Sequence, residues 1–245
     1  MDWHTRFTQQ ARWTTELRRY LFTRTELDRV ERILEVGCGT GAVLATLSPT
    51  KAHCFGLDIN DTYLKQATRH APGVTLVQGD AHQLPFASAQ FDCVYYHFTL
   101  LWIADPLAAL GEAQRLIRPG GWVMALAEPD YGGRIDYPDD LVETGRMQAE
   151  SLRRQGADIH LGRRLGALFH QAGLQNIETG VLSGQWREPP SQVDLDLEWA
   201  VLEADLRGML SIQELTRLRQ IDRQAWQSGE RLLFVPTFYA IGQVE

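Results

Sequence analysis

Short apolar runs alternate with amphipathic stretches through the first half of the chain. The apolar runs are rich in β-branched and aromatic residues, as buried strands are, and the stretches between them show the spacing of helices. Strands are expected at residues 33–36, 52–59, 74–77, 91–98 and 122–127. Helices are expected at residues 3–29, 42–47, 61–69 and 106–117. This alternation predicts right-handed βαβ units and a parallel sheet with helices on both faces, which is a doubly wound α/β fold.

The order of elements changes after residue 128. A polar segment rich in glycine and proline leads into a charged helix that extends to about residue 155. Further helices are expected at residues 161–172 and 193–227, and further strands at residues 177–182 and 234–244. These insertions and the N-terminal helices are the segments from which a lid over a site could be built.

The strand at residues 33–36 runs directly into Gly37, Gly39 and Gly41, which stand at alternate positions before the next helix. Without Cβ atoms these residues can adopt positive φ angles and let a ligand touch the backbone, and the helix offers unpaired N–H groups. The segment also satisfies the loose dinucleotide pattern G-x-G-x-x-G/A. Glu35 argues against that interpretation, because a carboxylate there would repel a pyrophosphate but could pair with an ammonium group. A cationic, nucleotide-like cofactor is the first hypothesis.

Four further polar residues, Asp58, Asp80, His97 and Glu128, also fall at the ends of predicted strands. Ligands of parallel sheets bind outside the carboxyl ends of the strands, so these side chains are expected around one pocket. Asp58 is placed to accept hydrogen bonds from two ribose hydroxyls, and Asp80 from an exocyclic amine such as that of adenine. Together with Glu35, they fit a cofactor with sulfonium and ammonium groups better than one with a pyrophosphate.

Charge and cysteine content narrow the class of protein. Lys and Arg total 24 against 31 Asp and Glu, and the net charge of −7 gives no electrostatic basis for binding nucleic acid. Cys38, Cys54 and Cys93 show no C-x-x-C spacing, so neither a disulfide framework nor a metal site is indicated. No apolar run approaches the ~18 residues of a membrane span, and the first residues do not resemble a signal peptide. A cytoplasmic protein without a membrane or nucleic-acid partner is expected.

The segment Glu35-Val36-Gly37-Cys38-Gly39-Thr40-Gly41 resembles motif I of class I S-adenosylmethionine-dependent methyltransferases. The similarity covers about residues 30–128, where Asp58, Asp80, the segment 91–106 and the turn 117–121 follow in the family's order. The chain is most similar to the small-molecule, UbiE-like type. The resemblance implies a Rossmann-like, seven-stranded, mostly parallel sheet whose antiparallel last strand is supplied by residues 234–244, with N-terminal helices and helical insertions. It also implies S-adenosyl-L-methionine as cofactor and S-adenosyl-L-homocysteine as product.

The resemblance assigns roles within a single domain of residues 1–245. Residues 1–30 would form a helical cap, residues 31–128 the cofactor-binding core, and residues 129–245 the acceptor-side half. The methionine part of the cofactor would lie against the glycine loop, the ribose against Asp58 and the adenine against Asp80. The cofactor-binding residues expected on this basis are Glu35, Gly37, Cys38, Gly39, Thr40, Gly41, Asp58, Ile59, Asp80, Ala81 and His97.

Methyl transfer from a sulfonium is an in-line displacement, to which a protein contributes positioning, desolvation and, for some acceptors, proton removal. His97 is the leading base candidate because imidazole titrates near neutral pH, and a role in the pocket without chemistry is an equal alternative. Glu128 is the second catalytic candidate. Residues expected to contact the acceptor are Phe98, Trp102, Glu128, Asp130, Tyr131 and Arg134. The acceptor is expected to be a small or medium organic molecule, methylated at oxygen, nitrogen or carbon.

Two other functions remain open from the sequence. An NAD(P)-dependent oxidoreductase is permitted by the loose glycine pattern, and a non-catalytic S-adenosylmethionine-binding module is permitted because binding motifs do not demonstrate turnover. The Asn-Pro-Pro-Tyr-like motif of nucleobase amino-methylation is absent after residue 95, where Tyr96-His97-Phe98-Thr99 stands instead. Both a monomer and a homodimer are compatible with the helical insertions.

Overall fold

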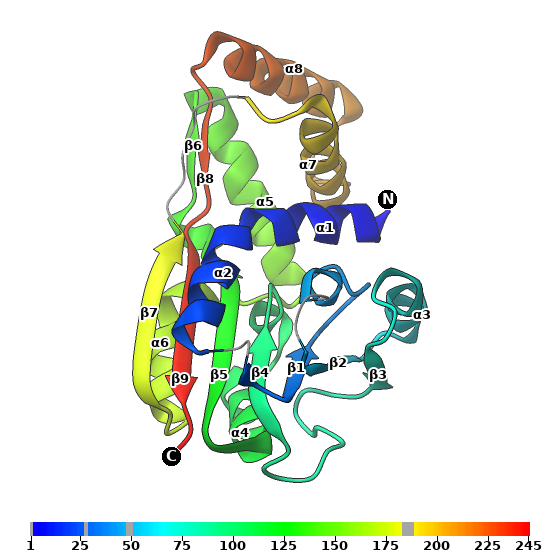
Figure 1. Cartoon of the computed structure of the whole chain (residues 1–245). Helices are drawn as coiled ribbons and strands as arrows, with labels where there is room; N and C mark the ends of the chain where they lie inside the picture. The colour runs from blue at the N-terminus through cyan, green and yellow to red at the C-terminus, as the bar shows by residue number, and fades with distance from the viewer. Residues whose placement is uncertain (1, 27–28, 48–50, 183–188) are drawn as a thin grey trace.

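The computed structural model describes residues 2–26, 29–47, 51–182 and 189–245. A seven-stranded sheet with the order β3-β2-β1-β4-β5-β9-β7 forms its centre (Figure 1). The strands are β1 (Arg32–Val36), β2 (His53–Asp58), β3 (Thr75–Gln78), β4 (Phe91–Tyr96), β5 (Ile117–Pro129), β7 (Gln175–Leu182) and β9 (Thr237–Gln243). Strands β3, β2, β1, β4 and β5 pair in parallel, whereas β9 is antiparallel to both β5 and β7. The predicted mostly parallel sheet with an antiparallel last strand is confirmed.

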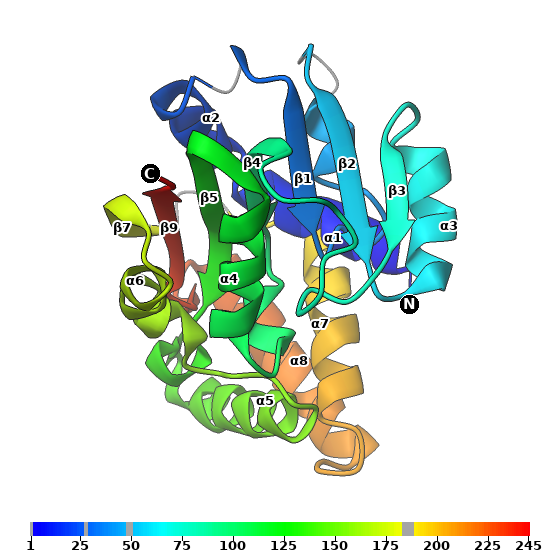
Figure 2. The same cartoon turned by 90° about the horizontal axis from the view of Figure 1, so that it is seen from below.

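Helices cover both faces of this sheet, as the alternating pattern predicted. These are α1 (Trp3–Trp13), α2 (Thr15–Arg24), α3 (Asp61–His70), α4 (Pro106–Leu116) and α6 (Leu161–Gln171). Leu110 of α4 and Phe169 of α6 belong to one buried apolar cluster, and Leu21 of α2 and Leu64 of α3 belong to a second. Figure 2 shows α4 and α6 in front of the sheet and α1 and α2 behind it. The burial of apolar side chains on both faces accounts for the nearly continuous apolar sequence of the central strands.

The insertions form a separate layer beyond the carboxyl ends of the parallel strands (Figure 1). It consists of β6 (Ile135–Tyr137), α5 (Val142–Arg154), α7 (Gln192–Asp205), α8 (Ile212–Ser228) and β8 (Leu232–Phe234). Strands β6 and β8 pair with each other and not with the main sheet. Short 3₁₀ helices are η2 (Leu44–Leu47), η3 (Leu100–Trp102), η4 (Tyr131–Gly133) and η5 (Asp139–Leu141). This layer, together with α1, covers the edge of the sheet where ligands are expected.

Four predicted elements differ from the structure. The strand expected at residues 122–127 begins already at Ile117 as β5, so the turn expected at 117–121 lies within that strand. The helix expected at residues 42–47 is the short 3₁₀ helix η2, and the one expected at residues 193–227 is divided into α7 and α8. The division has a local cause, because Gly208 has a φ of +81° and Ser211 begins α8 with a capping box. The strand expected at residues 234–244 begins in β8 and continues as β9 only after Pro236, which lacks the N–H that a sheet ladder requires. Residues 27–28, within the helices expected at 3–29, lie outside the described residues.

Candidate cofactor and acceptor site

The glycine loop crosses the carboxyl end of β1. Gly37 and Gly39 have φ angles of +74° and +51°, in the left-handed region that glycine adopts without strain. The N–H groups of Gly37 and Cys38 both donate to the carbonyl of Leu57 in β2, at 2.7 and 3.0 Å. A Cβ atom at Gly37 would lie 2.3 Å from Cγ2 of Thr99, in the loop that follows β4. The glycine loop is therefore held between two strand ends, and only glycine fits where it passes Thr99.

Glu35 lies beneath this loop and is 2% exposed. Its Oε2 accepts a hydrogen bond from the Tyr95 hydroxyl at 2.9 Å. Burial raises the pKa of Glu35 to about 8, while the Tyr95 hydroxyl and the Arg18 guanidinium act in the opposite direction. Glu35 also lines the cavity at the end of the sheet. It is thus a carboxyl group that a positively charged ligand group would convert to the ionised form.

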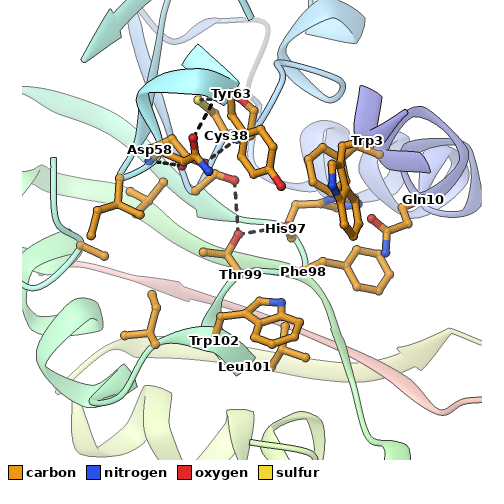
Figure 3. A pocket seen from close by; sticks show the side chains of 18 of the residues that line it. Trp3, Gln10, Cys38, Asp58, Tyr63, His97, Phe98, Thr99, Leu101 and Trp102 are labelled. Carbon is orange, nitrogen blue, oxygen red and sulfur yellow. Dashed lines mark hydrogen bonds between the residues drawn. The ribbon is translucent and has the colours of Figure 1, made fainter. Parts of the chain in front are cut away.

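Asp58 binds the glycine loop from the end of β2. Its Oδ2 accepts a hydrogen bond from the N–H of Gly39 at 2.7 Å, and its Oδ1 accepts one from the N–H of Asn60 at 2.8 Å. Each carboxylate oxygen can accept a second hydrogen bond, so acceptor capacity remains for a ligand. Asp58 lines the cavity beside Cys38 and across from Trp102 (Figure 3).

Asp80 follows β3 at the rim of the same cavity. Its Oδ1 accepts hydrogen bonds from the backbone N–H and from Nδ1 of His82, at 2.9 and 2.7 Å, and these bonds lower the pKa of Asp80. Nε2 of His82 in turn accepts a hydrogen bond from the N–H of Asp105 at 3.3 Å, which places the imidazole proton on Nδ1. His82 also lines the cavity, although the sequence argument gave it no role.

All of these groups surround one cavity of about 630 Å³. Every residue predicted to bind the cofactor lines this cavity except Thr40 and Gly41. Thr40 is fully buried, and its Oγ1 forms a hydrogen bond with Nδ1 of His4 at 2.9 Å. A Cβ atom at Gly41 would lie 3.1 Å from the Cβ of Ala71, just past the end of α3. Thr40 and Gly41 therefore support the glycine loop from behind and do not line the cavity, where the cofactor was expected.

His97 follows β4 and is buried at the cavity wall. Its Nε2 forms a hydrogen bond of 2.9 Å with Oγ1 of Thr14, which also accepts a hydrogen bond from Arg18. Burial and, to a smaller extent, the positive charge of Arg18 lower the pKa of His97 to about 3. The imidazole is therefore neutral at physiological pH, and one of its nitrogens is already engaged. This environment makes His97 a weaker proton acceptor than the near-neutral titration of a free imidazole suggested.

Glu128 is fully buried at the end of β5 and is not among the residues that line the cavity. Its Oε1 accepts hydrogen bonds from the N–H groups of Thr99 and Leu100, both at 3.0 Å, and its Oε2 accepts one from Leu101 at 3.1 Å. Burial raises the pKa of Glu128 to about 7, although the three N–H donors act to lower it. The catalytic and acceptor-binding roles predicted for Glu128 do not fit this position. Glu128 instead positions the loop that carries Thr99 and Leu101 to the cavity.

The acceptor-side candidates that line the cavity are Phe98, Trp102 and Tyr131. Asp130 and Arg134 do not line it, and each is engaged in an ion pair within the protein. Oδ1 of Asp130 accepts a hydrogen bond from Nη2 of Arg163 at 2.8 Å, and Nε of Arg134 lies 2.6 Å from Oδ2 of Asp136. The direct acceptor contacts predicted for Asp130 and Arg134 therefore do not agree with the structure.

Several walls of the cavity come from residues to which the sequence argument assigned no role. Those from α1, α5 and α7 are Trp3, Arg6, Phe7, Gln10, Gln148, Leu152, Val201 and Asp205. Arg6 of α1 forms an ion pair with Glu198 of α7, so the two helices meet over the cavity. Trp3 and Gln10 point toward the same space as Phe98 (Figure 3). Helical periodicity marked these segments as a lid, but which side chains face inward depends on how the helices cross.

Comparison with known proteins identifies the family. A family model described as a methyltransferase domain matches residues 34–125. The demethylmenaquinone methyltransferase of Staphylococcus saprophyticus is 32% identical over 62% of this chain and 74% of that protein. The demethylmenaquinone methyltransferase of Staphylococcus carnosus is 28% identical over 73% of this chain and 80% of that protein. An uncharacterised 37.1 kDa protein in transposon TN4556 of Streptomyces fradiae is 36% identical, and the chain spans 43% of its length. The chain belongs to the class I S-adenosylmethionine-dependent methyltransferases, as the resemblance implied, and nothing in these relatives supports an oxidoreductase.

Solved structures show the same fold. Phosphoethanolamine N-methyltransferase 2 of Haemonchus contortus, in complex with phosphomonomethylethanolamine and S-adenosylhomocysteine, gives a TM-score of 0.58 at 19% identity over 88% of this chain and 49% of that one. The [4+2]-cyclase SpnF gives a TM-score of 0.62 at 19% identity over 94% of this chain and 80% of that one. One of these proteins is a methyltransferase and the other a cyclase, so the fold by itself does not define the reaction.

Two features are absent from the described ranges. None of their helices has both the length and the apolar character needed to cross a membrane. They also contain no group of three or more His, Cys, Asp or Glu side chains placed to hold a metal ion.

Proposed function

We propose that this methyltransferase acts on a small organic acceptor that binds between the loop after β4 and helices α1, α5 and α7. The observation that carries this proposal is the continuity of the cavity, which extends from Glu35 and Asp58 at the strand ends to Gln148 and Asp205 on the helical layer. Residues 31–128 would then hold the cofactor, and residues 1–30 and 129–245 would supply the walls around the acceptor. One continuous cavity can hold the two reactants side by side in a fixed orientation.

The residues at the strand ends fit S-adenosylmethionine. We assign Glu35 to the ammonium group, Asp58 to the ribose hydroxyls, and Asp80 with Ala81 to the adenine. The carboxylates of Asp58 and Asp80 make this end of the cavity anionic, and Glu35 adds a carboxyl group that can ionise against a cation, which suits a cationic ligand and disfavours a pyrophosphate. When bound, the cofactor supplies a methyl group carried on a positively charged sulfur. The glycine loop contributes a wall without side chains, because a Cβ at Gly37 has no room beside Thr99.

We assign His97 a positioning role and not one in proton removal. Its lowered pKa and its hydrogen bond to Thr14 both support this assignment. The Tyr131 hydroxyl is neutral at physiological pH as any phenol is, and burial raises its pKa further, to about 12. Cys38 and Cys93 are buried thiols that form no disulfide, which supports the proposal that the protein works in the reducing cytoplasm.

Two experiments test the proposed function. Calorimetric titration with S-adenosylhomocysteine and with NAD should show binding of the former alone. Incubation with S-adenosylmethionine labelled in its methyl group, together with a metabolite extract, should then yield a labelled small molecule. Binding of S-adenosylhomocysteine without labelled product across fractionated extracts would favour the non-catalytic binding module.

The binding of S-adenosylhomocysteine is expected to release protons in a way that depends on Glu35. In the ligand-free protein the pKa of Glu35 is raised to about 8, so its carboxyl is largely protonated at pH 7, and pairing with an ammonium group requires that this proton leave. Affinity should therefore rise with pH between about 6 and 8. Calorimetry in phosphate and in Tris, which differ in ionisation enthalpy, measures the protons released.

The Glu35→Gln variant is the comparison. Protons that the ligand itself releases contribute equally in both proteins, so the difference in proton release between them reports on Glu35. The variant should bind more weakly and release fewer protons than the wild type. Glu143→Gln changes an exposed glutamate of α5 and should behave as the wild type. Equal proton release from wild type and Glu35→Gln would contradict the assignment of Glu35 to the ammonium group.

A further inference from the structure

Among the described residues, the acceptor side of the cavity is lined by one carboxylate, that of Asp205 at the end of α7, to which the sequence assigned no role. Its Oδ2 accepts a hydrogen bond from Nε2 of Gln148 at 2.9 Å, and its Oδ1 accepts one from Nε2 of Gln155 at 3.2 Å. We propose that Asp205 selects the acceptor by pairing with a protonated amino group, so that the acceptor is an organic amine. This inference rests on the proposed function, because it concerns the acceptor half of the same cavity.

The carboxylate of Asp205 is fixed in place before any acceptor binds. Arg134 donates a hydrogen bond to Oε1 of Gln148, which leaves the amide nitrogen of Gln148 to face Asp205. Arg134 is itself held by Asp136, whose Oδ1 lies 2.7 Å from Nη2 of Arg231. This buried network orders Gln148, and through it Asp205, without placing a guanidinium on Asp205. Preorganisation of this kind lowers the entropy lost when an acceptor binds.

The charges around the cavity leave Asp205 available to a cation. Within the described residues, its side-chain hydrogen-bond partners are neutral amides, which do not cancel its charge. Among the residues that the structure describes, Arg6 is the arginine that lines the cavity, and it is ion-paired with Glu198. A half-buried carboxylate that lines a cavity interacts most favourably with a ligand that brings the opposite charge. A carboxylate or phosphate on the acceptor would instead be repelled.

The apolar part of the wall indicates what the amine is attached to. Phe98 and Trp102 line the cavity from the loop after β4, and Val201 lines it one helical turn before Asp205. Aromatic rings bind apolar groups and also attract a cation at their faces. An amine with an aromatic or branched aliphatic body, such as an arylalkylamine, matches both parts of this wall.

The test measures binding to the protein–S-adenosylhomocysteine complex, which does not depend on turnover. The probes are 2-phenylethylamine, 2-phenylethanol and phenylacetate, which share a phenyl body and differ in charge. The wild type should bind the amine at least about tenfold more tightly than the alcohol and should bind the acid most weakly. In Asp205→Asn the amine and the alcohol should bind within about threefold of each other, with the affinity for S-adenosylhomocysteine unchanged. Asp196→Asn makes the same change at an exposed site of α7 and should keep the preference for the amine.

Three results would overturn the inference: no binding of the amine to the wild type, equal binding of the amine and the alcohol, or a preference for the amine that survives in Asp205→Asn. Failure of the proposed function would look different. If the amine binds through Asp205 but no labelled product forms from amines or extracts, recognition by Asp205 stands and methyl transfer does not. If labelled products form but the wild type shows no preference for the amine, methyl transfer stands and the role of Asp205 is refuted.

Discussion

Replacement of Asp58 by alanine is expected to weaken the binding of S-adenosylhomocysteine by about 100-fold. Hydrogen bonds to a charged group contribute about 1.5–3 kcal/mol each, and the variant loses those that the carboxylate would make to the ribose. It also releases the N–H of Gly39, which Oδ2 of Asp58 holds at 2.7 Å, so the glycine loop loses an anchor. Calorimetric titration measures the affinity directly, and thermal denaturation of the ligand-free variant checks that the fold is intact.

Asparagine should not rescue this position. Both oxygens of Asp58 accept backbone hydrogen bonds, from Gly39 and Asn60, and an amide would turn its NH₂ group toward one of these donors in either orientation. Asp61→Ala is the matched control, because Asp61 is an exposed aspartate of α3 whose described ionic partner is Lys65. A folded Asp58→Ala variant that binds S-adenosylhomocysteine within about threefold of the wild type would refute the assignment of Asp58 to the ribose.

The Glu128→Ala variant is expected to lose about 3 kcal/mol of folding stability, which corresponds to a fall of roughly 10 °C in Tm for a chain of this size. The change removes the acceptor for three N–H groups, those of Thr99, Leu100 and Leu101, of which the last two are buried, and leaves a void at the end of β5. Each orphaned donor costs about 1–3 kcal/mol if no water reaches it. Thermal denaturation without ligand measures the effect, and Glu143→Ala, at an exposed site, should change Tm by less than about 2 °C.

The pH dependence of stability provides an independent test of this role. The pKa of Glu128 is raised from 4.5 to about 7 in the folded protein. As pH rises from about 4.5 to 7, the unfolded chain loses the Glu128 proton while the folded chain retains it, so this group makes unfolding progressively easier. The glutamine of Glu128→Gln cannot titrate, so the free energy of unfolding of this variant should fall less steeply than that of the wild type as pH rises over this interval. If the free energy of unfolding depended on pH identically in the wild type and in Glu128→Gln, the pKa of Glu128 would not be raised in the folded protein.

The sequence was most informative for the sheet and for the cofactor end of the cavity. Both depend on patterns that are local in the chain, namely apolar strands, glycines that permit positive φ angles, and acids that follow strands. Because all parallel strands end at one edge, the residue that follows each strand has a predictable position. Glu35, Asp58 and Asp80 were placed at one cavity on this basis, and they line it.

The same argument placed Glu128 at the cavity edge, but the direction of its side chain was decided by a neighbour distant in the sequence. The loop from Thr99 to Leu101 presents three N–H groups that need an acceptor, and Glu128 on the adjacent strand supplies it. Similarly, the pKa of His97 is lower than expected, because His97 is buried and lies near the positive charge of Arg18 in α2. Both effects arise from contacts that no pattern within one segment records.

The sequence by itself therefore determined the fold, the glycine loop and the acids that line the cavity at the strand ends, because hydrophobic spacing and strand order fix them. Only the tertiary structure decided which residues line the rest of the cavity. Tyr131 lines the cavity while its neighbours Asp130 and Arg134 pair with Arg163 and Asp136, since burying those charges requires partners inside the protein. The wall contributed by α1, α5 and α7 follows from the angles at which these helices cross, and those angles depend on packing between segments far apart in the chain.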